Sequence, residues 1–451
     1  MSVAVESTRT DLASIVGDSR VVSDPAVCAS AAADGMTPGS VIYPPSAEQV
    51  AEVLKYAADQ DLAVIPFRNG TKLAIGNPPR RYDLALCVKD LNRVWHYEPG
   101  DLTVTVEPGM KLGDFQHFLA RHRLWLPLDP AGGSRASIGG ILAANSSGPL
   151  RLRYGTPRDM VLGMKIATTD GKLIKTGGRV VKNVAGYDFA KLMIGSYGTL
   201  GVIVEASFKL FPLPAECSTF VVSTATLGAA REFRRRLLGS PLTPMRILLL
   251  DATAASLVRG TRQLEGAGQG FEIWVEAGGS ERVLERYRRE LQQLAQTSGA
   301  AAEPMDAGQA KESWARVADF RTWLPGVFAN PVVVRVHLPI AAGETFVERV
   351  LEEARRSKIH VGCFAQTGAG VISLCLIESP EARIDPPFVN TLRDFAQSLG
   401  GLLVVESCPA GFKSRLDVWG PMADDFEVMQ KVKAVWDPKG VLAPGRLVGG
   451  L

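Results

Sequence analysis

Glycine is concentrated between residues 132 and 201, and this concentration limits what the chain can fold into. The 451 residues include 45 glycines, and the stretch shows little helical periodicity before "NVAGYDFAKLMIGS". A long irregular segment inside a compact domain is usually functional. Glycine also permits backbone conformations and close approaches that other residues do not. We therefore expect a binding site built largely from backbone groups in this part of the chain.

The composition narrows the class of protein. A chain of 451 residues exceeds one compact core, so two or three domains are expected. A net charge of +3 gives no electrostatic footprint for nucleic acid. The six cysteines form no C-x-x-C pair, which argues against a disulfide framework or a cysteine zinc site and favours a reducing cytoplasm. No apolar run approaches ~20 residues, so neither a signal peptide nor a membrane span is expected.

The first half of the chain predicts mixed helices and strands. Residues 1–38 read as a lead-in with one weak helix. Residues 39–214 open with a strand, a helix capped by Ser46 and a second strand, "LAVIPF". The Pro-rich end of "TLGVIVEASFKLFPLP" places a domain boundary at about 214.

The second half alternates strands and helices in two similar halves. We expect residues 215–408 to form an antiparallel sheet with helices on one face, built from ferredoxin-like units and interrupted by a linker near 300–330. Residues 409–451 then read as a helix stopped by Asp437-Pro438 and an extended Pro/Gly segment. The fold class predicted is α+β.

Several familiar catalytic and nucleotide motifs are missing from the sequence. It has no Walker loop, no G-x-G-x-x-G between a strand and a helix, no H-E-x-x-H and no G-x-S-x-G. The five histidines are isolated, which favours structural roles for them, and no metal site is predicted.

Three glycine-rich segments at wide spacing remain: "PFRNGTK", "DPAGGSRASIGGILAANSSGPLRLRYG" and "KNVAGYDFAKLMIGSYGTLGVI". In the second segment we expect Ser137, Gly139, Gly140, Asn145, Ser147 and Gly148 to offer bare backbone amides. Successive amides in such loops can form a concave nest for an anion. Each segment alone could be a tight turn, but three in one domain favour a large diphosphate cofactor.

These segments resemble the FAD-binding domain of the vanillyl-alcohol-oxidase (PCMH-type) flavoprotein superfamily, and within it the FAD-binding subunits of glycolate oxidase-type complexes. The resemblance is strong over 39–214 and clear in the closing "WDPKGVLAPGRL". It implies a two-part FAD-binding domain, formed by 39–214 and 409–451, and an inserted α+β cap formed by 215–408. FAD is expected to be noncovalent, because no His or Cys occurs in 66–72 or 129–207.

The resemblance also assigns cofactor-binding residues. The diphosphate would lie on the first loop, the second segment would line the cofactor, and the third would run beside the flavin or adenine. The residues are Pro66, Arg68, Asn69, Gly70 and Thr71; Ser137, Gly139, Gly140, Asn145, Ser147 and Gly148; and Gly198, Gly201, Val202 and Ile203.

Two departures from the superfamily pattern stand out. Phe67 and Arg68 replace the Arg and first Gly of a Pro-Arg-Gly-x-Gly-Thr loop, and Arg68 would carry on the order of 1 kcal/mol of strain if φ must be positive there. We expect a surface-facing Arg68, with a phosphate or ribose contact as the alternative. In the cap, Gln366 and Ser407 stand where metal-binding or substrate-binding histidines are expected, although Glu406 and Lys413 fit. Neither Gln nor Ser can act as a general base near neutral pH.

Candidate substrate ligands come from the basic residues that flank the flavin-side segments. Arg153, Arg158 and Lys182 could hold a carboxylate, since a bidentate guanidinium suits one. Alternatively, these three residues neutralise the FAD phosphates or lie on the protein surface.

The predicted function is FAD-dependent oxidation of a small 2-hydroxy acid, glycolate or D-lactate. The resemblance implies partners, namely an FAD-containing catalytic subunit and an iron–sulfur subunit, and a cytoplasmic location that could reach the inner membrane through them. Three alternatives stay open: a non-catalytic FAD-binding electron-relay subunit, a stand-alone flavin oxidoreductase for another alcohol or hydroxy acid, and an NAD(P)H-dependent reductase.

Overall fold

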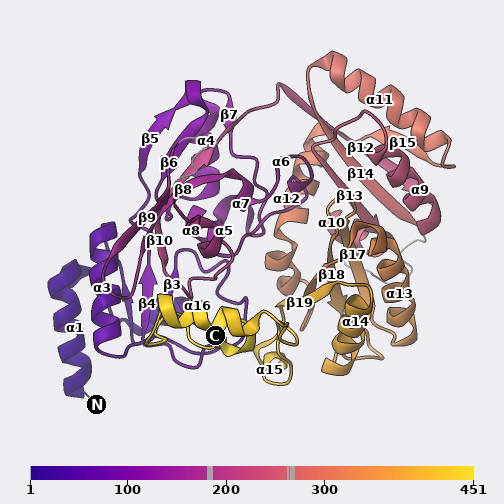
Figure 1. The fold of residues 1–451 in the computed structure, drawn as a ribbon. Helices are drawn as coiled ribbons and strands as arrows, with labels where there is room; N and C mark the ends of the chain where they lie inside the picture. The colour runs from indigo at the N-terminus through magenta and orange to yellow at the C-terminus, as the bar shows by residue number, and fades with distance from the viewer. Residues whose placement is uncertain (1, 180–185, 262–263, 265–269) are drawn as a thin grey trace. The chain divides into compact units, whose positions relative to one another are not determined.

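The computed structural model describes residues 2–179, 186–261, 264 and 270–451 and is drawn as a ribbon in Figure 1. The chain divides into two compact units. The first unit contains residues 1–147, 156–213 and 421–451, and the second contains 148–155 and 214–420. Each unit is built around its own sheets and cores.

The first unit contains two main sheets. The smaller one has the order β1-β2-β4-β3, in which β2, β4 and β3 are parallel and β1 is antiparallel. The larger one is antiparallel, with the order β5-β6-β10-β8-β9, and β11 pairs separately with β7. The strands are β1 (Val21–Val22), β2 (Ser40–Ile42), β3 (Val64–Phe67), β4 (Leu84–Cys87), β5 (Val94–Glu98), β6 (Thr103–Val106), β7 (Leu124–Trp125), β8 (Val161–Ala167), β9 (Leu173–Gly177), β10 (Val202–Lys209) and β11 (Phe211–Pro212).

Helices surround these sheets, and the best predicted one is α3. The Ser46 hydroxyl accepts a hydrogen bond from the Gln49 amide at 3.3 Å, so the predicted N-cap is confirmed. Val50, Val53 and Leu54 are buried in the core that α3 shares with β2 and β4. The helices of this unit are α1 (Ser2–Val16), α2 (Pro25–Ser30), α3 (Ala47–Asp59), α4 (Leu112–Ala120), α5 (Ile138–Ala143), α7 (Pro157–Met160), α8 (Phe189–Met193) and α16 (Phe426–Trp436).

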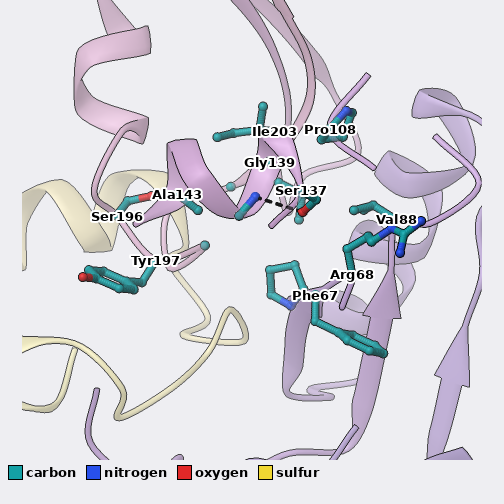
Figure 2. Close-up of a pocket in the computed structure, with 15 residues that line it drawn as sticks. Phe67, Arg68, Val88, Pro108, Ser137, Gly139, Ala143, Ser196, Tyr197 and Ile203 are labelled. Carbon is teal, nitrogen blue, oxygen red and sulfur yellow. Dashed lines mark hydrogen bonds between the residues drawn. The ribbon is translucent and has the colours of Figure 1, made fainter. Parts of the chain in front are cut away.

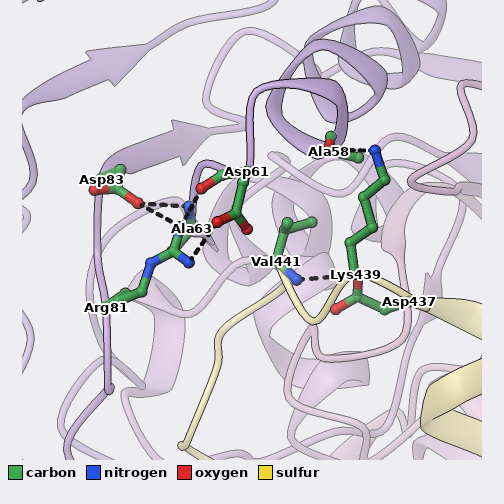
Figure 3. A network of polar contacts seen from close by, with 8 residues as sticks. All are labelled: Ala58, Asp61, Ala63, Arg81, Asp83, Asp437, Lys439 and Val441. Carbon is green, nitrogen blue, oxygen red and sulfur yellow. Dashed lines mark hydrogen bonds and ion pairs between the residues drawn. The ribbon is translucent and has the colours of Figure 1, made fainter.

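The C-terminal segment is fixed to the first unit beside β3. Val64 donates its amide to the Val441 carbonyl and accepts from the Ala443 amide, each at 2.8 Å. Asp437, which follows α16, is buried and accepts hydrogen bonds from the Val441 amide and, at 2.6 Å, from Lys433 Nζ. Figure 3 shows the Asp437–Val441 contact together with other polar contacts of this unit. The buried carboxylate therefore fixes the turn that follows the Asp-Pro stop.

The second unit is organised around one antiparallel sheet of eight strands in the order β15-β12-β14-β13-β17-β18-β16-β19. Every pairing in it is antiparallel. The strands are β12 (Glu216–Thr224), β13 (Arg246–Asp251), β14 (Phe271–Gly279), β15 (Ala301–Pro304), β16 (Val332–His337), β17 (His360–Gln366), β18 (Val371–Ile377) and β19 (Leu402–Ser407).

Helices cover both faces of this sheet, so the expectation of helices on one face is wrong. One core joins alternate strand residues such as Val334 and Leu374 to α9, α11, α13 and α14. The other joins their neighbours Val333 and Cys375 to α10 and α12. Successive strand residues point to opposite faces, so the apolar runs supply both cores. The helices are α6 (Arg151–Tyr154), α9 (Leu227–Leu238), α10 (Ala252–Val258), α11 (Glu281–Gln296), α12 (Ala307–Trp323), α13 (Gly343–Arg356), α14 (Pro386–Ser398) and α15 (Ala410–Lys413).

Two boundaries differ from those expected in this unit. The predicted linker near 300–330 is wrong, because it contains β15 and the 17-residue helix α12, which buries Trp314, Val317 and Phe320 at helical spacing. The compact unit also runs to Gly420 rather than to 408. Residues beyond 408 stay with the sheet because the Val405 amide donates to the Val418 carbonyl at 2.8 Å.

Candidate functional site

Two adjoining cavities lie in the first unit where β3 ends, with empty volumes of about 500 and 550 Å³. Both are lined by Pro66, Phe67, Arg68, Ser137, Gly140, Ala143 and Tyr197, so they form one trough. Figure 2 shows the open space between helix α5, which carries Ala143, and the end of β3, which carries Phe67. Segments that are distant in sequence therefore meet around one space.

Twelve of the fifteen predicted cofactor residues line this trough. They are Pro66, Arg68, Asn69, Gly70, Thr71, Ser137, Gly139, Gly140, Gly198, Gly201, Val202 and Ile203. Tyr197 and Arg446 are among the lining residues that the sequence interpretation did not include. Arg446 is buried and donates to the carbonyls of Leu73 and Ile75, and nothing in the local "PGRL" pattern showed that it would reach the trough.

The loop of Asn69, Gly70 and Thr71 (the 69–71 loop) presents free amides. In the described part of the chain, none of these three amides donates a hydrogen bond. Gly70 has φ of 70°, which turns successive N–H groups toward one side and favours glycine. Arg68, Lys72 and Arg446 add positive charge to the lining. The loop is therefore suited to an anion with several oxygen atoms.

The second glycine-rich segment behaves differently from the prediction. The Gly139 amide donates to the Pro108 carbonyl at 2.8 Å, the Gly140 amide to Ser137 Oγ at 3.3 Å and the Asn145 amide to the Leu142 carbonyl at 3.0 Å. The expectation of bare amides is wrong at these positions, because α5 is capped and pairs with the turn before α4. A Cβ on Gly139 would stand 2.7 Å from Pro108 Cβ, so this glycine permits close packing.

The third segment also uses glycine for close packing. A Cβ on Gly198, whose φ is +75°, would lie 2.7 Å from Pro66 Cγ. A Cβ on Gly201 would lie 2.7 Å from Ile166 Cγ2. These two contacts bring the start of β10 against β3 and β8, and so close the trough at that end.

Asn145, Ser147 and Gly148 do not line the trough. Asn145 Oδ1 and Ser147 Oγ are buried in the first unit and have no hydrogen-bond partner in the part that the structure describes. Buried polar atoms normally find partners, so these two oxygens are available to a polar ligand. Gly148 belongs to the second unit, and the structure does not group it with the other predicted cofactor residues.

The candidate substrate ligands that the structure describes, Arg153 and Arg158, belong to different units. Arg153, in the second unit, donates to the Thr243 carbonyl at 2.7 Å. Arg158, in the first unit, donates to the Lys191 carbonyl at 3.3 Å. Lys182 lies outside the described residues. Their proposed contact with a carboxylate stays a prediction.

The strain that a positive φ would have caused at Arg68 is absent, because the condition for it is not met. Its φ is not positive, and Gly70 is the residue of the loop with that conformation. Arg68 is half-buried rather than surface-facing: its Nε donates to the Gly109 carbonyl at 3.1 Å, and its Nη1 donates to Asn69 Oδ1.

A second polar group, which we call the Glu406 cluster, lies on the sheet of the second unit and consists of Arg321, Arg335 and Glu406. The buried Glu406 carboxylate pairs with Arg321, from α12, and with Arg335 Nε, from β16, at 3.0 Å. Gln366 Oε1 is buried and has no hydrogen-bond partner among the described residues. Two guanidinium groups therefore lie against one buried carboxylate.

The residues around this cluster do not provide metal ligands. Gln366 and Ser407 end β17 and β19, where histidines were expected, and Lys413 is buried at the end of α15. His337, on β16, has a pKa lowered to about 4 by loss of hydration and by the charges of Arg335 and Arg151, so its ring is neutral near pH 7. Among the described residues, no group of three or more His, Cys, Asp or Glu side chains could hold a metal ion.

Comparison with known proteins identifies the class. Residues 38–177 match the FAD binding domain family, and residues 213–447, more than half of the chain, match the C-terminal domain family of FAD linked oxidases. The chain belongs to the FAD-linked oxidase family, and FAD is its cofactor.

Particular relatives span nearly the whole chain. Glycolate oxidase subunit GlcD of Bacillus subtilis is 25% identical over 91% of this chain and 89% of its own. The mitochondrial D-lactate dehydrogenase [cytochrome] of Arabidopsis thaliana is 27% identical over 91% of this chain and 73% of its own. The structure of 4-ethylphenol oxidase from Gulosibacter chungangensis, 16% identical, superposes with a TM-score of 0.76 over 98% of this chain and 96% of that one. The α+β, PCMH-type fold is therefore confirmed.

The trough fits FAD on chemical grounds. The free amides of the 69–71 loop and the nearby cations suit a diphosphate. No helix in the described part of the chain is both long and apolar enough to cross a membrane.

Proposed function

We propose that the chain is an FAD-dependent oxidoreductase that oxidises a small 2-hydroxy acid such as glycolate or D-lactate. FAD would be held noncovalently in the trough, with its diphosphate on the 69–71 loop and with Ser137 and Gly140 along its length. No His or Cys is among the residues that line the trough, which supports noncovalent binding. When bound, FAD supplies the acceptor for the hydride of the α-carbon.

The observation that carries the choice of substrate is the charge of the Glu406 cluster. A guanidinium group binds a carboxylate with paired hydrogen bonds, and two arginines, Arg321 and Arg335, lie against the single carboxylate of Glu406. Such a pair of arginines suits a substrate that is itself an acid. The names of the relatives, glycolate oxidase and D-lactate dehydrogenase, support the same class.

A second candidate function is an FAD-binding relay subunit that turns nothing over by itself. Gln366 and Ser407 favour it, because neither side chain can take the hydroxyl proton near neutral pH. One relative is named as a subunit, which supports assembly into a multisubunit complex. We propose that the partners include an FAD-containing catalytic subunit and an iron–sulfur subunit.

Anaerobic titration of the purified chain separates these functions. We expect the chain to carry flavin that acid precipitation releases into solution, and glycolate or D-lactate to bleach the flavin band. Bleaching that needs co-expressed partners would favour the relay subunit. A chain that binds no flavin under any condition would contradict both.

A substitution then tests the substrate assignment. Arg335→Gln should raise the KM for the hydroxy acid about tenfold or more and leave the flavin spectrum unchanged. Arg355→Gln is the matched control, because it removes the same charge at an exposed position of α13. Equal KM values in the two variants would remove Arg335 from the substrate site.

A further inference from the structure

The guanidinium group of Arg68 connects two segments of the trough wall. Its Nε donates to the Gly109 carbonyl and its Nη1 to Asn69 Oδ1, and Asn69 Nδ2 in turn donates to the Arg135 carbonyl at 2.6 Å. The 69–71 loop is thereby tied to the turn before α4 and to the turn before α5. Figure 2 places Arg68 beside Val88 at the end of β3.

The Gly109 anchor is rigid. A Cβ at this position would stand 2.0 Å from the Val88 carbonyl oxygen, so only glycine fits. The Gly109 amide donates to the Leu91 carbonyl at 2.7 Å, which fixes the peptide on its other side. The Gly109 carbonyl that accepts from Arg68 is therefore fixed in position, and this hydrogen bond holds the guanidinium group in place.

The charge of Arg68 is not neutralised within the described part of the chain, where it forms no ion pair with a carboxylate. Two of the five guanidinium N–H groups are used, and the remaining donors stay available. Arg446 differs, because its guanidinium lies 3.9 Å from the Asp34 carboxylate. Arg68 is thus a fixed, half-buried and uncompensated cation beside a loop with free amides.

We propose that Arg68 is a ligand of the FAD diphosphate and that it also positions Asn69 in the 69–71 loop. The planar fork would donate to a phosphate oxygen while its other edge keeps the Gly109 and Asn69 contacts. This inference rests on the proposed function, because it requires the diphosphate to lie at the 69–71 loop.

The test compares flavins that have and lack the diphosphate. The apoprotein is titrated with FAD and with riboflavin at several salt concentrations, and flavin fluorescence gives Kd. Arg68→Gln should weaken FAD binding by about 10- to 100-fold, change riboflavin binding by less than about twofold, and reduce the salt dependence of the FAD Kd. Arg68→Lys, which keeps the charge but loses the fork, should fall between.

A control variant shows whether the loss of any positive charge in the first unit weakens FAD binding. Arg121→Gln removes one charge from an exposed position of the same unit and should leave both Kd values unchanged. An FAD Kd for Arg68→Gln within about twofold of the wild type would overturn the inference, and so would equal weakening of FAD and riboflavin by both Arg68 variants. Failure of the wild-type apoprotein to bind FAD would overturn the proposed function as well.

Discussion

The 69–71 loop of the first unit and the Glu406 cluster of the second both gather polar groups, but they use different parts of the chain. The loop presents main-chain amides of consecutive residues, set by the positive φ of Gly70. The cluster presents side chains from α12, β16 and β19, separated by up to 85 positions in sequence between Arg321 and Glu406. A site made of backbone tolerates changes of side chain but not of conformation, whereas a site made of buried charges depends on each partner.

The largest effect should come from breaking the charge balance of the cluster. Glu406→Ala leaves Arg321 and Arg335 buried against each other without a carboxylate, so the free energy of unfolding of the second unit should fall by about 3–5 kcal/mol. Chemical denaturation measures it. Glu381→Ala, which removes only the exposed partner of Lys358, should leave the free energy of unfolding nearly unchanged. Equal losses would mean that burial does not distinguish the two pairs.

The second effect concerns Asp251, a carboxyl group of the second unit that is buried and bonded to backbone amides. Burial raises the pKa of Asp251 to about 7, although its oxygen accepts from the amides of Ala254 and Cys363. The folded state keeps the proton up to about pH 7 and the unfolded state releases it near pH 4. The free energy of unfolding should therefore fall, by on the order of 2–4 kcal/mol, as pH rises between these values.

Asp251→Asn isolates this contribution. The amide oxygen can still accept both backbone hydrogen bonds, so the helix cap survives and the pH-dependent part should disappear. Thermal unfolding of both proteins between pH 4 and 8 measures it. Parallel pH profiles for wild type and variant would assign the dependence to other groups.

A smaller effect is expected from the backbone of the first unit. Gly198→Ala adds a Cβ at φ of +75° and 2.7 Å from Pro66 Cγ, which should cost about 1–2 kcal/mol and weaken FAD binding about tenfold. Gly100→Ala is the control, because its Cβ would meet open space and its φ is not positive. Unchanged FAD affinity in Gly198→Ala would show that the trough does not depend on this contact.

The smallest effect is expected on treatment with a chelator. Glu406 is engaged by two arginines, and Gln366 and Ser407 are poor metal ligands. Dialysis against EDTA should leave turnover of the hydroxy acid and the flavin spectrum unchanged. Lost turnover that zinc restores would show that the cluster rearranges around a metal ion.

Sequence patterns predicted the first unit better than the second. The Ser46 cap, the buried face of α3 and the loop around Gly70 follow from local periodicity and turn chemistry, and the structure has them. Helix α12 was missed because its apolar face is narrow and interrupted by charged residues. The bare amides expected at Gly139 and Gly140 were wrong, since their hydrogen bonds go to partners that local sequence does not identify.

By itself the sequence determined where the backbone can bend sharply, and so which loop could present free amides to a diphosphate. Glycine carries that information locally, because positive φ is open to it and costly to other residues. Only the tertiary structure decided that Arg68 holds Gly109 and Asn69, and that Arg321 and Arg335 share Glu406. Those contacts depend on strand register and helix packing, which bring together charges whose positions in the sequence carry no mutual signal.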